Sequence, residues 1–233
     1  MELPIEISKL HIPDKIINKW QSIVNTLAEM IHVPAALIMR VVPPHIEVFR
    51  SSETNNNPYK AGDKEHLAGL YCERVMRTRN ELLVPNALKD ENWNKNPDIK
   101  LGMISYLGFP ILWPTGEIFG TICVVDSKEN RYGEVYKKLL FQSKELVDAH
   151  LDLIYQNMRL ENTVRELEKS LNEIKVLRGF LSICSYCKKI RDDKGHWSNI
   201  ETYIRDRSEV EFSHGICPEC SIKVYSDLEN RRK

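Results

Sequence analysis

The stretch Gly-Phe-Pro-Ile-Leu-Trp-Pro-Thr-Gly-Glu-Ile-Phe-Gly-Thr-Ile-Cys-Val-Val-Asp, residues 108–126, carries the strongest fold signal in the chain. Two apolar runs, residues 108–113 and 118–126, flank the short segment 114–117. β-Branched and aromatic residues favour strands, and a Pro and a Gly between two such runs are typical of a turn. The stretch therefore predicts two antiparallel strands joined by a tight turn.

The residues before this hairpin predict further helices and strands. Residues 14–31 repeat apolar side chains every three or four positions, which predicts a helix, and residues 64–79 predict another. Residues 36–42 and 46–49 predict a second hairpin around two prolines, and residues 85–100 predict a long loop of the kind that often carries function. Helices and hairpins without regular βαβ units indicate an α+β domain built on an antiparallel sheet. We assign it to residues 1–138.

A long helix is predicted for residues 134–178, which contain neither proline nor glycine. Apolar residues recur every seven positions, as the d positions of heptads: Leu139, Leu146, Leu153, Leu160, Leu167 and Ile174. The corresponding a positions are Ser143, His150, Asn157, Val164 and Leu171. An asparagine at an a position fixes the register of parallel dimers.

These heptads predict a coiled-coil linking helix over residues 139–179 and a homodimer, with a tetramer as the alternative assembly. Both seam positions are apolar only beyond Asn157, so the part near the first domain is expected to be weak and His150 partly solvated. A helix with such a weak section could relay a change from the first domain to the end of the chain. An amphipathic helix packed on its own domain is the other interpretation.

The segment 180–233 contains two CxxC pairs, Cys184 with Cys187 and Cys217 with Cys220. A two-residue spacer lets both sulfurs of a pair reach one ion, and four thiolates complete a tetrahedral zinc site with no open position. The pairs therefore predict a structural zinc module, because so short a segment has too little core to fold without a metal.

The spacer between the two pairs is 29 residues long, more than in an ordinary zinc ribbon. A helix predicted for residues 197–204 would occupy the extra length. Three alternatives stay open at this point: the pairs form a redox dithiol, the cysteines share no site, or His214 replaces one cysteine as a ligand.

Charge and hydropathy exclude several classes of partner. The chain has 33 basic and 33 acidic residues, and residues 182–233 have ten basic and nine acidic ones, so no basic footprint for nucleic acid is present. No run approaches the roughly 18 apolar residues that a membrane helix needs, and the N-terminus lacks the pattern of a signal peptide. We therefore expect a cytoplasmic protein with no nucleic-acid and no membrane partner.

Short motifs in residues 71–126 resemble a GAF domain of bacterial signalling proteins. They are Tyr-Cys-Glu at 71–73, Leu-Val-Pro-Asn-Ala at 83–87, Asn-Pro-Asp-Ile at 96–99, Ser-Tyr-Leu-Gly-Phe-Pro at 105–110 and Phe-Gly-Thr-Ile-Cys-Val-Val-Asp at 119–126. By extension the resemblance covers about residues 15–155. Residues 183–193 and 212–220 resemble a double-CxxC, zinc-ribbon-like cassette attached to bacterial sensor proteins and response regulators.

The GAF resemblance implies an antiparallel sheet with helices on both sides, a small-molecule pocket on one face, and dimerisation through terminal helices. It does not identify the ligand, because a fold does not determine a function. Trp93, Met103 and Tyr106 are the candidate ligand-binding residues, since they lie in or after the long loop beside the expected pocket. Cys72, on a predicted helix, and Cys123, on a predicted strand, are expected to be core residues.

Alternation along the strand at 119–125 places Cys123 on the same face as Phe119, Thr121 and Val125. No glycine-rich phosphate loop, nucleophile elbow or metalloprotease helix is present in the sequence, so we assign no catalytic residue and expect no enzyme.

The sequence as a whole predicts a signal-transduction sensor or adaptor. In this interpretation the first domain binds a small molecule, a dimeric coiled coil carries the change, and the zinc module contacts a protein partner. A thiol-redox or metal sensor with the CxxC pairs as its input is the main alternative, and an enzyme acting in the GAF cavity is the third.

Overall fold

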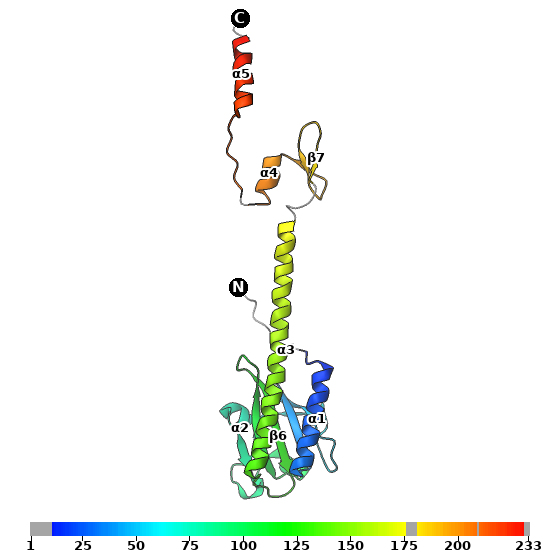
Figure 1. Cartoon of the computed structure of the whole chain (residues 1–233). Helices are drawn as coiled ribbons and strands as arrows, with labels where there is room; N and C mark the ends of the chain where they lie inside the picture. The colour runs from blue at the N-terminus through cyan, green and yellow to red at the C-terminus, as the bar shows by residue number, and fades with distance from the viewer. Residues whose placement is uncertain (1–10, 176–180, 209, 231–233) are drawn as a thin grey trace. The chain divides into compact units, whose positions relative to one another are not determined.

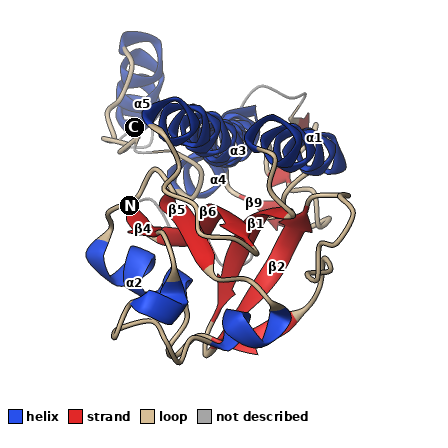
Figure 2. Ribbon diagram, turned by 90° about the horizontal axis from the view of Figure 1, so that it is seen from below, coloured by secondary structure: helices blue, strands red, loops and turns tan. Residues whose placement is uncertain are grey.

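The computed structural model describes residues 11–175, 181–208 and 210–230, and the chain divides into two compact units, Met1–Glu161 and Asn162–Lys233. The first unit is built on a six-stranded antiparallel sheet in the order β3-β2-β1-β6-β5-β4 (Figures 1 and 2). Within the described ranges, none of the helices combines the length and the apolar character that crossing a membrane requires.

The two predicted hairpins form the middle of this sheet. The strands are β1 (Ala35–Val42), β2 (His45–Ser51), β3 (Lys64–His66), β4 (Leu82–Val84), β5 (Ser105–Leu112) and β6 (Ile118–Asp126). Strand β6 pairs with β1 and with β5, so that Cys123 lies opposite Leu37 on one side and Gly108 on the other. In the turn between β5 and β6, Gly116 adopts φ +83°, a conformation that glycine reaches without steric cost.

Helices cover both faces of the sheet (Figure 2). Helices α1 (Asp14–Ile31) and α3 (Glu134–Lys175) pack on one face, where Trp20 and Leu151 are fully buried. Helix α2 (Tyr71–Thr78) and the short helices η2 (Ala87–Lys89) and η3 (Pro97–Leu101) lie on the other. The expected α+β class, with an antiparallel sheet between helices, is confirmed.

Three local predictions are wrong, each because a tertiary or turn constraint overrides the periodicity. Residues 64–66 form edge strand β3, and α2 begins only at Tyr71, after Gly69 with φ +86° has broken the helical path. Trp197 lies in a strand rather than a helix. The pairing of β5 with β6 shifts register after Ile111, which leaves Phe119 as an extra residue facing α1 and α3, away from Cys123.

Helix α3 has two different halves. In the first half Leu140, Val147 and Leu151 are fully buried against the sheet and α1. His150 is 7% exposed and accepts a hydrogen bond from Nε1 of Trp20 at 3.1 Å, so the expectation of a partly solvated His150 is wrong. The a positions of the first half, Ser143 and His150, therefore face α1 of the same chain rather than a second copy.

Helix α3 carries an exposed apolar stripe at heptad spacing, which begins near the end of its first half and continues through its second half. The exposed residues are Leu146, Leu153, Leu160, Val164, Leu167 and Leu171. The side chain of Ile174 and the predicted helix end at Gly179 lie outside the described residues.

The second unit contains a small three-stranded antiparallel sheet of β7 (Ser182–Ile183), β8 (Ile190–Arg191) and β9 (Trp197–Ser198). Helices α4 (Ile200–Arg205) and α5 (Pro218–Asn230) follow. Among the side chains that the structure describes here, the buried apolar ones are Ile190 and Tyr203. Apolar burial therefore contributes little to the stability of this unit.

Candidate functional site

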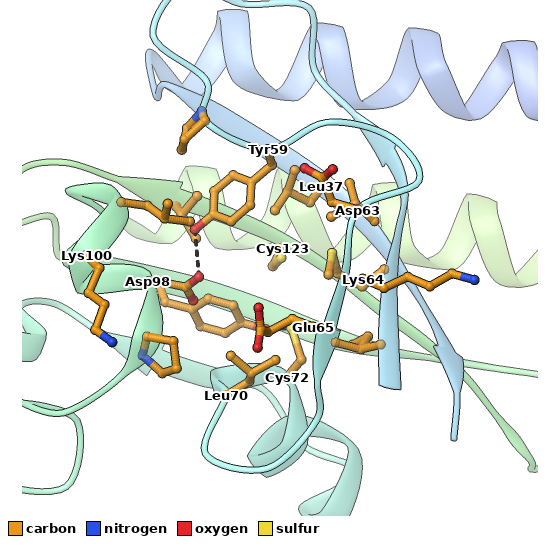
Figure 3. A pocket seen from close by; sticks show the side chains of 18 residues that line it. Leu37, Tyr59, Asp63, Lys64, Glu65, Leu70, Cys72, Asp98, Lys100 and Cys123 are labelled. Carbon is orange, nitrogen blue, oxygen red and sulfur yellow. Dashed lines mark hydrogen bonds between the residues drawn. The ribbon is translucent and has the colours of Figure 1, made fainter. Parts of the chain in front are cut away.

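A cavity of about 570 Å³ lies between the sheet and the segments that cover its α2 face (Figure 3). Its sheet side is formed by residues of β1, β2, β5 and β6: Leu37, Met39, Ile46, Val48, Tyr106, Cys123 and Val125. Tyr59 from the segment after β2, Leu70 and Cys72 from the start of α2, and Asp98 from η3 form the opposite walls. The volume matches that of small-molecule sites, and the apolar sheet side is completed by charged residues that include Asp63, Lys64 and Glu65.

One polar pair stands out inside this cavity. The hydroxyl of Tyr59 donates a hydrogen bond to Oδ1 of Asp98 at 2.9 Å. The side chain of Asn96 caps η3 by accepting from the Asp98 N–H at 2.9 Å, and it donates to the carbonyl of Gly69 at 3.1 Å. These bonds tie η3 to the start of α2 and hold the Asp98 carboxyl group at the cavity wall.

The surroundings of the Asp98 carboxyl group shift its pKa. Burial raises the pKa of Asp98, and the nearby charge of Glu65 raises it further, while the hydrogen bond from Tyr59 acts in the opposite direction. Burial and the charge of Asp98 also raise the pKa of Tyr59, so its hydroxyl keeps its proton and stays a donor. Figure 3 shows the amino group of Lys64 extending away from Asp98, and Lys64 and Lys100 both line the cavity. The Asp98 carboxyl group is therefore a buried acceptor on the cavity wall.

The structure places one of the three expected ligand-binding residues in the cavity. Tyr106 lines it. Trp93 packs on Tyr71 with ring centroids 4.9 Å apart, and Tyr71 in turn stacks on Tyr106 at 4.7 Å, so Trp93 supports the wall from behind. Met103 is buried and borders a separate hollow next to Asp126. Whether any of these side chains touches a ligand stays a prediction.

Sequence reasoning missed Tyr59 and Asp98. A signal for Asp98 was present: Asn96-Pro97 combines a residue favoured before a helix with one favoured at its first position, inside the loop predicted to be functional. Tyr59 follows a polar loop with no periodicity, and nothing local marks its contact with Asp98, 39 residues away.

The first CxxC pair forms a turn, and the second lies at the start of α5; both hold their sulfurs close to backbone N–H groups. The N–H of Cys187 lies 3.5 Å from Sγ of Cys184, and the N–H of Cys220 lies 3.5 Å from Sγ of Cys217. These backbone hydrogen bonds lower the pKa of Cys184 and of Cys217, which favours the thiolate form that a metal needs.

The structure does not bring the two CxxC pairs together. Across the described residues, no three His, Cys, Asp or Glu side chains lie close enough to hold an ion. Residues 210–217, which lead to the second pair, form neither helix nor strand, so no described secondary structure positions that pair against the first. The expected closed site of four thiolates is therefore not assembled within the described ranges.

The sheet, the helices on both faces and the cavity define an α+β domain with an internal cavity. The model of the GAF domain family matches residues 17–146, more than half of the chain, and the chain belongs to this family. GAF domains are typically signalling or ligand-binding domains. No curated protein matches the chain.

Solved structures share this fold at low sequence identity. The blue-light absorbing form of the Thermosynechococcus elongatus PixJ GAF domain has a TM-score of 0.54 and 12% identity, over 72% of this chain and 98% of that one. A Neisseria meningitidis free methionine-R-sulfoxide reductase in complex with its substrate has a TM-score of 0.51 and 9% identity, over 65% of this chain and 84% of that one. The GAF domain of a Coxiella burnetii phosphoenolpyruvate-protein phosphotransferase has a TM-score of 0.50 and 13% identity, over 66% of this chain and 90% of that one. Such identities establish the fold alone.

Proposed function

We propose that the protein is a signal-transduction sensor or adaptor whose first unit binds a small molecule in the cavity beside Asp98. The cavity of about 570 Å³ is the observation that carries this proposal. Its apolar sheet side would hold the body of a ligand, and the Asp98 carboxylate, with one oxygen bonded to Tyr59 at 2.9 Å, would orient it. A carboxylate only accepts hydrogen bonds, so the ligand class is one that presents an N–H or O–H donor.

Helix α3 is the element through which ligand binding would reach the rest of the chain. It belongs to the core of the first unit through Leu140 and Leu151 and continues without interruption to Lys175. The exposed leucine stripe supports a parallel homodimer along the second half, with Asn157 setting the register. We expect a coupling between ligand and partner on the order of 1–3 kcal/mol, equal in both directions.

The second unit is proposed to be a structural zinc module that contacts a protein partner. Cys184, Cys187, Cys217 and Cys220 would supply the ligands, and zinc would supply the folding free energy that this unit lacks from apolar burial. Reduced thiols of this kind fit a cytoplasmic protein. A thiol-redox or metal sensor with the CxxC pairs as input, and an enzyme acting in the cavity, are the competing functions.

Native mass spectrometry of the full chain, purified without oxygen, tests the sensor proposal. We expect a small molecule to co-purify with the wild type, and Asp98→Ala to lose it. Glu81→Gln removes an exposed carboxylate outside the cavity and should keep the bound mass. A wild type without bound mass, or equal binding in Asp98→Ala, would contradict the proposal. Conversion of the bound molecule by the wild type would favour the enzyme.

A further inference from the structure

Cys72 and Cys123 are distant in the sequence, yet both of their thiols line the same cavity (Figure 3). Cys72 lies in the first turn of α2, and Cys123 lies in the middle of β6. They are 7% and 1% exposed and carry no disulfide. A reagent therefore reaches them by way of the cavity rather than from the outer surface.

The surrounding strands bring polar groups to these two sulfurs. Tyr106 lies across Gly108, where a Cβ would come 2.2 Å from the tyrosine hydroxyl, so only a glycine leaves room for the ring. Gly108 is paired with Cys123, and the same hydroxyl lies 3.6 Å from Sγ of Cys72. Thr121 donates a second hydrogen bond to this sulfur, with 3.2 Å between Oγ1 and Sγ.

The two thiols have different surroundings, which gives them unequal roles. The neighbouring Cys123 thiol lowers the pKa of Cys72; Thr121, which donates to the Cys72 sulfur, and Tyr106 lower it further, and burial opposes them. Proximity to Cys72, together with burial, raises the pKa of Cys123. The thiol with the lower pKa is the better attacking group in oxidation chemistry, and a neighbouring protonated thiol can resolve the product.

We propose that Cys72 and Cys123 form an oxidation site at the floor of the cavity, which reacts with a small hydroperoxide and closes to a disulfide. The site lies within the cavity of the proposed sensor but needs no bound ligand, so it stands or falls separately from that function. Cys72 is the reacting thiol, Cys123 resolves it, and Thr121 is a positioning residue.

The chemistry balances in two steps. The Cys72 sulfur attacks one peroxide oxygen, the O–O bond breaks, and the departing oxygen leaves as water or an alcohol with the proton of the Cys72 thiol. Cys72 is then a sulfenic acid. The Cys123 sulfur attacks the Cys72 sulfur, the S–O bond breaks, and the hydroxyl leaves as water with the Cys123 proton. The two thiols lose two electrons in total, and the peroxide gains them.

Peptide mapping of the full chain tests the proposal. The reduced protein receives one equivalent of hydrogen peroxide, is alkylated under denaturing conditions and is digested with trypsin. We expect peptides 65–74 and 101–128 to be joined, with the loss of two hydrogens. Cys123→Ser should stop at a sulfenic acid on Cys72 that dimedone captures, and Cys72→Ser should leave Cys123 reduced. Separately alkylated peptides in the wild type, or oxidation of Cys123 in Cys72→Ser, would overturn the proposal.

The variant Thr121→Val tests whether Thr121 acts on Cys72 through its hydrogen bond or only fills space in the core. The substitution keeps the shape of the side chain but removes the donor to Cys72. We expect the pH midpoint for alkylation of Cys72 to rise and its oxidation to slow about tenfold. Alkylation of Cys184 in the same sample serves as the internal control and should not change. An unchanged pH midpoint for Cys72 would remove the assigned role of Thr121 and contradict the arrangement proposed for the site.

Discussion

The two units of this protein differ in what can hold them together. In the first unit Trp20 is fully buried and its Nε1 is hydrogen-bonded to His150, as part of one of two apolar layers on the sheet. In the second unit Trp197 is 48% exposed, and Ile190 and Tyr203 are the buried apolar side chains among those described. Since apolar burial contributes about 25 cal/mol per Å², the first unit can be stable by packing and the second needs a further stabiliser.

Helix α3 repeats this difference along its length. Its first half buries Leu140, Val147 and Leu151 in the first unit, while Leu160 and Leu167 of its second half are 64% and 58% exposed. The same seven-residue pattern thus serves packing within the chain at one end and leaves a surface at the other. A heptad pattern by itself does not say whether its partner is the same chain or a second copy.

Removing one cysteine ligand should have the largest effect and would show what holds the second unit. If the proposed zinc module is right, we expect Cys184→Ser to reduce zinc from about one ion per chain to none and to unfold the second unit, because the metal would supply its folding free energy. The thermal transition of the first unit should not move. Metal analysis together with circular dichroism measures both effects.

The control for this experiment is Ser185→Ala, which changes an exposed neighbour that carries no thiol. It should keep the zinc and the fold. A wild type that contains no zinc, with four freely titrating thiols in a folded second unit, would remove the metal from the explanation.

Placing charge in the exposed stripe of α3 should dissociate the proposed dimer. Leu160→Lys combined with Leu167→Lys would bury two unpaired charges in the seam, so the mass measured by light scattering should fall by half. Asn162→Lys adds one positive charge opposite the seam and should leave the dimer intact. A wild type that is monomeric at micromolar concentration would contradict the dimer, and a tetramer would contradict its two-stranded seam.

Acidification should weaken the first unit through His150. Burial, followed by the charge of Lys19, lowers the pKa of His150 in the folded state. The unfolded chain, with a histidine pKa of about 6.5, then binds the proton more readily, so stability present above that pH is lost as the pH falls through it. The loss has a limiting slope of about 1.4 kcal/mol per pH unit.

The variant His150→Gln can keep an acceptor for Trp20 but does not titrate. Urea unfolding followed by tryptophan fluorescence between pH 7.5 and 5.5 should show a smaller loss of stability in this variant than in the wild type. Parallel pH profiles for the two proteins would mean that the Trp20–His150 contact is not the acid-sensitive element.

The smallest effect is expected at Asp98, where the ionised carboxylate proposed to bind the ligand lowers the stability of the fold. Its raised pKa means that the fold disfavours the ionised form, so the wild type gains stability as the pH falls from the folded-state pKa toward the unfolded value. Asp98→Asn should therefore stabilise the first unit at pH 7 by about 0.5–1 kcal/mol and should weaken ligand binding. The stability difference should disappear in acid.

Asp63→Asn at the exposed mouth of the cavity is the matched control and should change stability very little. Thermal unfolding at pH 7 and pH 4 measures both variants. A loss of stability in Asp98→Asn would show that the bond from Tyr59 outweighs the cost of burying the carboxylate.

Local signals accounted for much of the fold but for little of the site. The hairpin at 108–126 and the helix at 14–31 follow from side-chain periodicity and turn residues that lie next to one another in the chain. The errors fall where a distant partner intervenes: residues 64–66 became a strand because β2 pairs with them, and His150 became buried because Trp20 reaches it.

The sequence by itself determined the longer helices and strands, their order and the two cysteine pairs, because these depend on neighbours a few residues apart. Only the tertiary structure decided that Tyr59 meets Asp98, that Trp20 meets His150, and that Cys72 and Cys123 share one cavity. Such contacts depend on strand register, and a single extra residue in β6 at Phe119 reverses which face a side chain occupies. The periodicity of one segment cannot predict that register, because the register is set by pairing between strands.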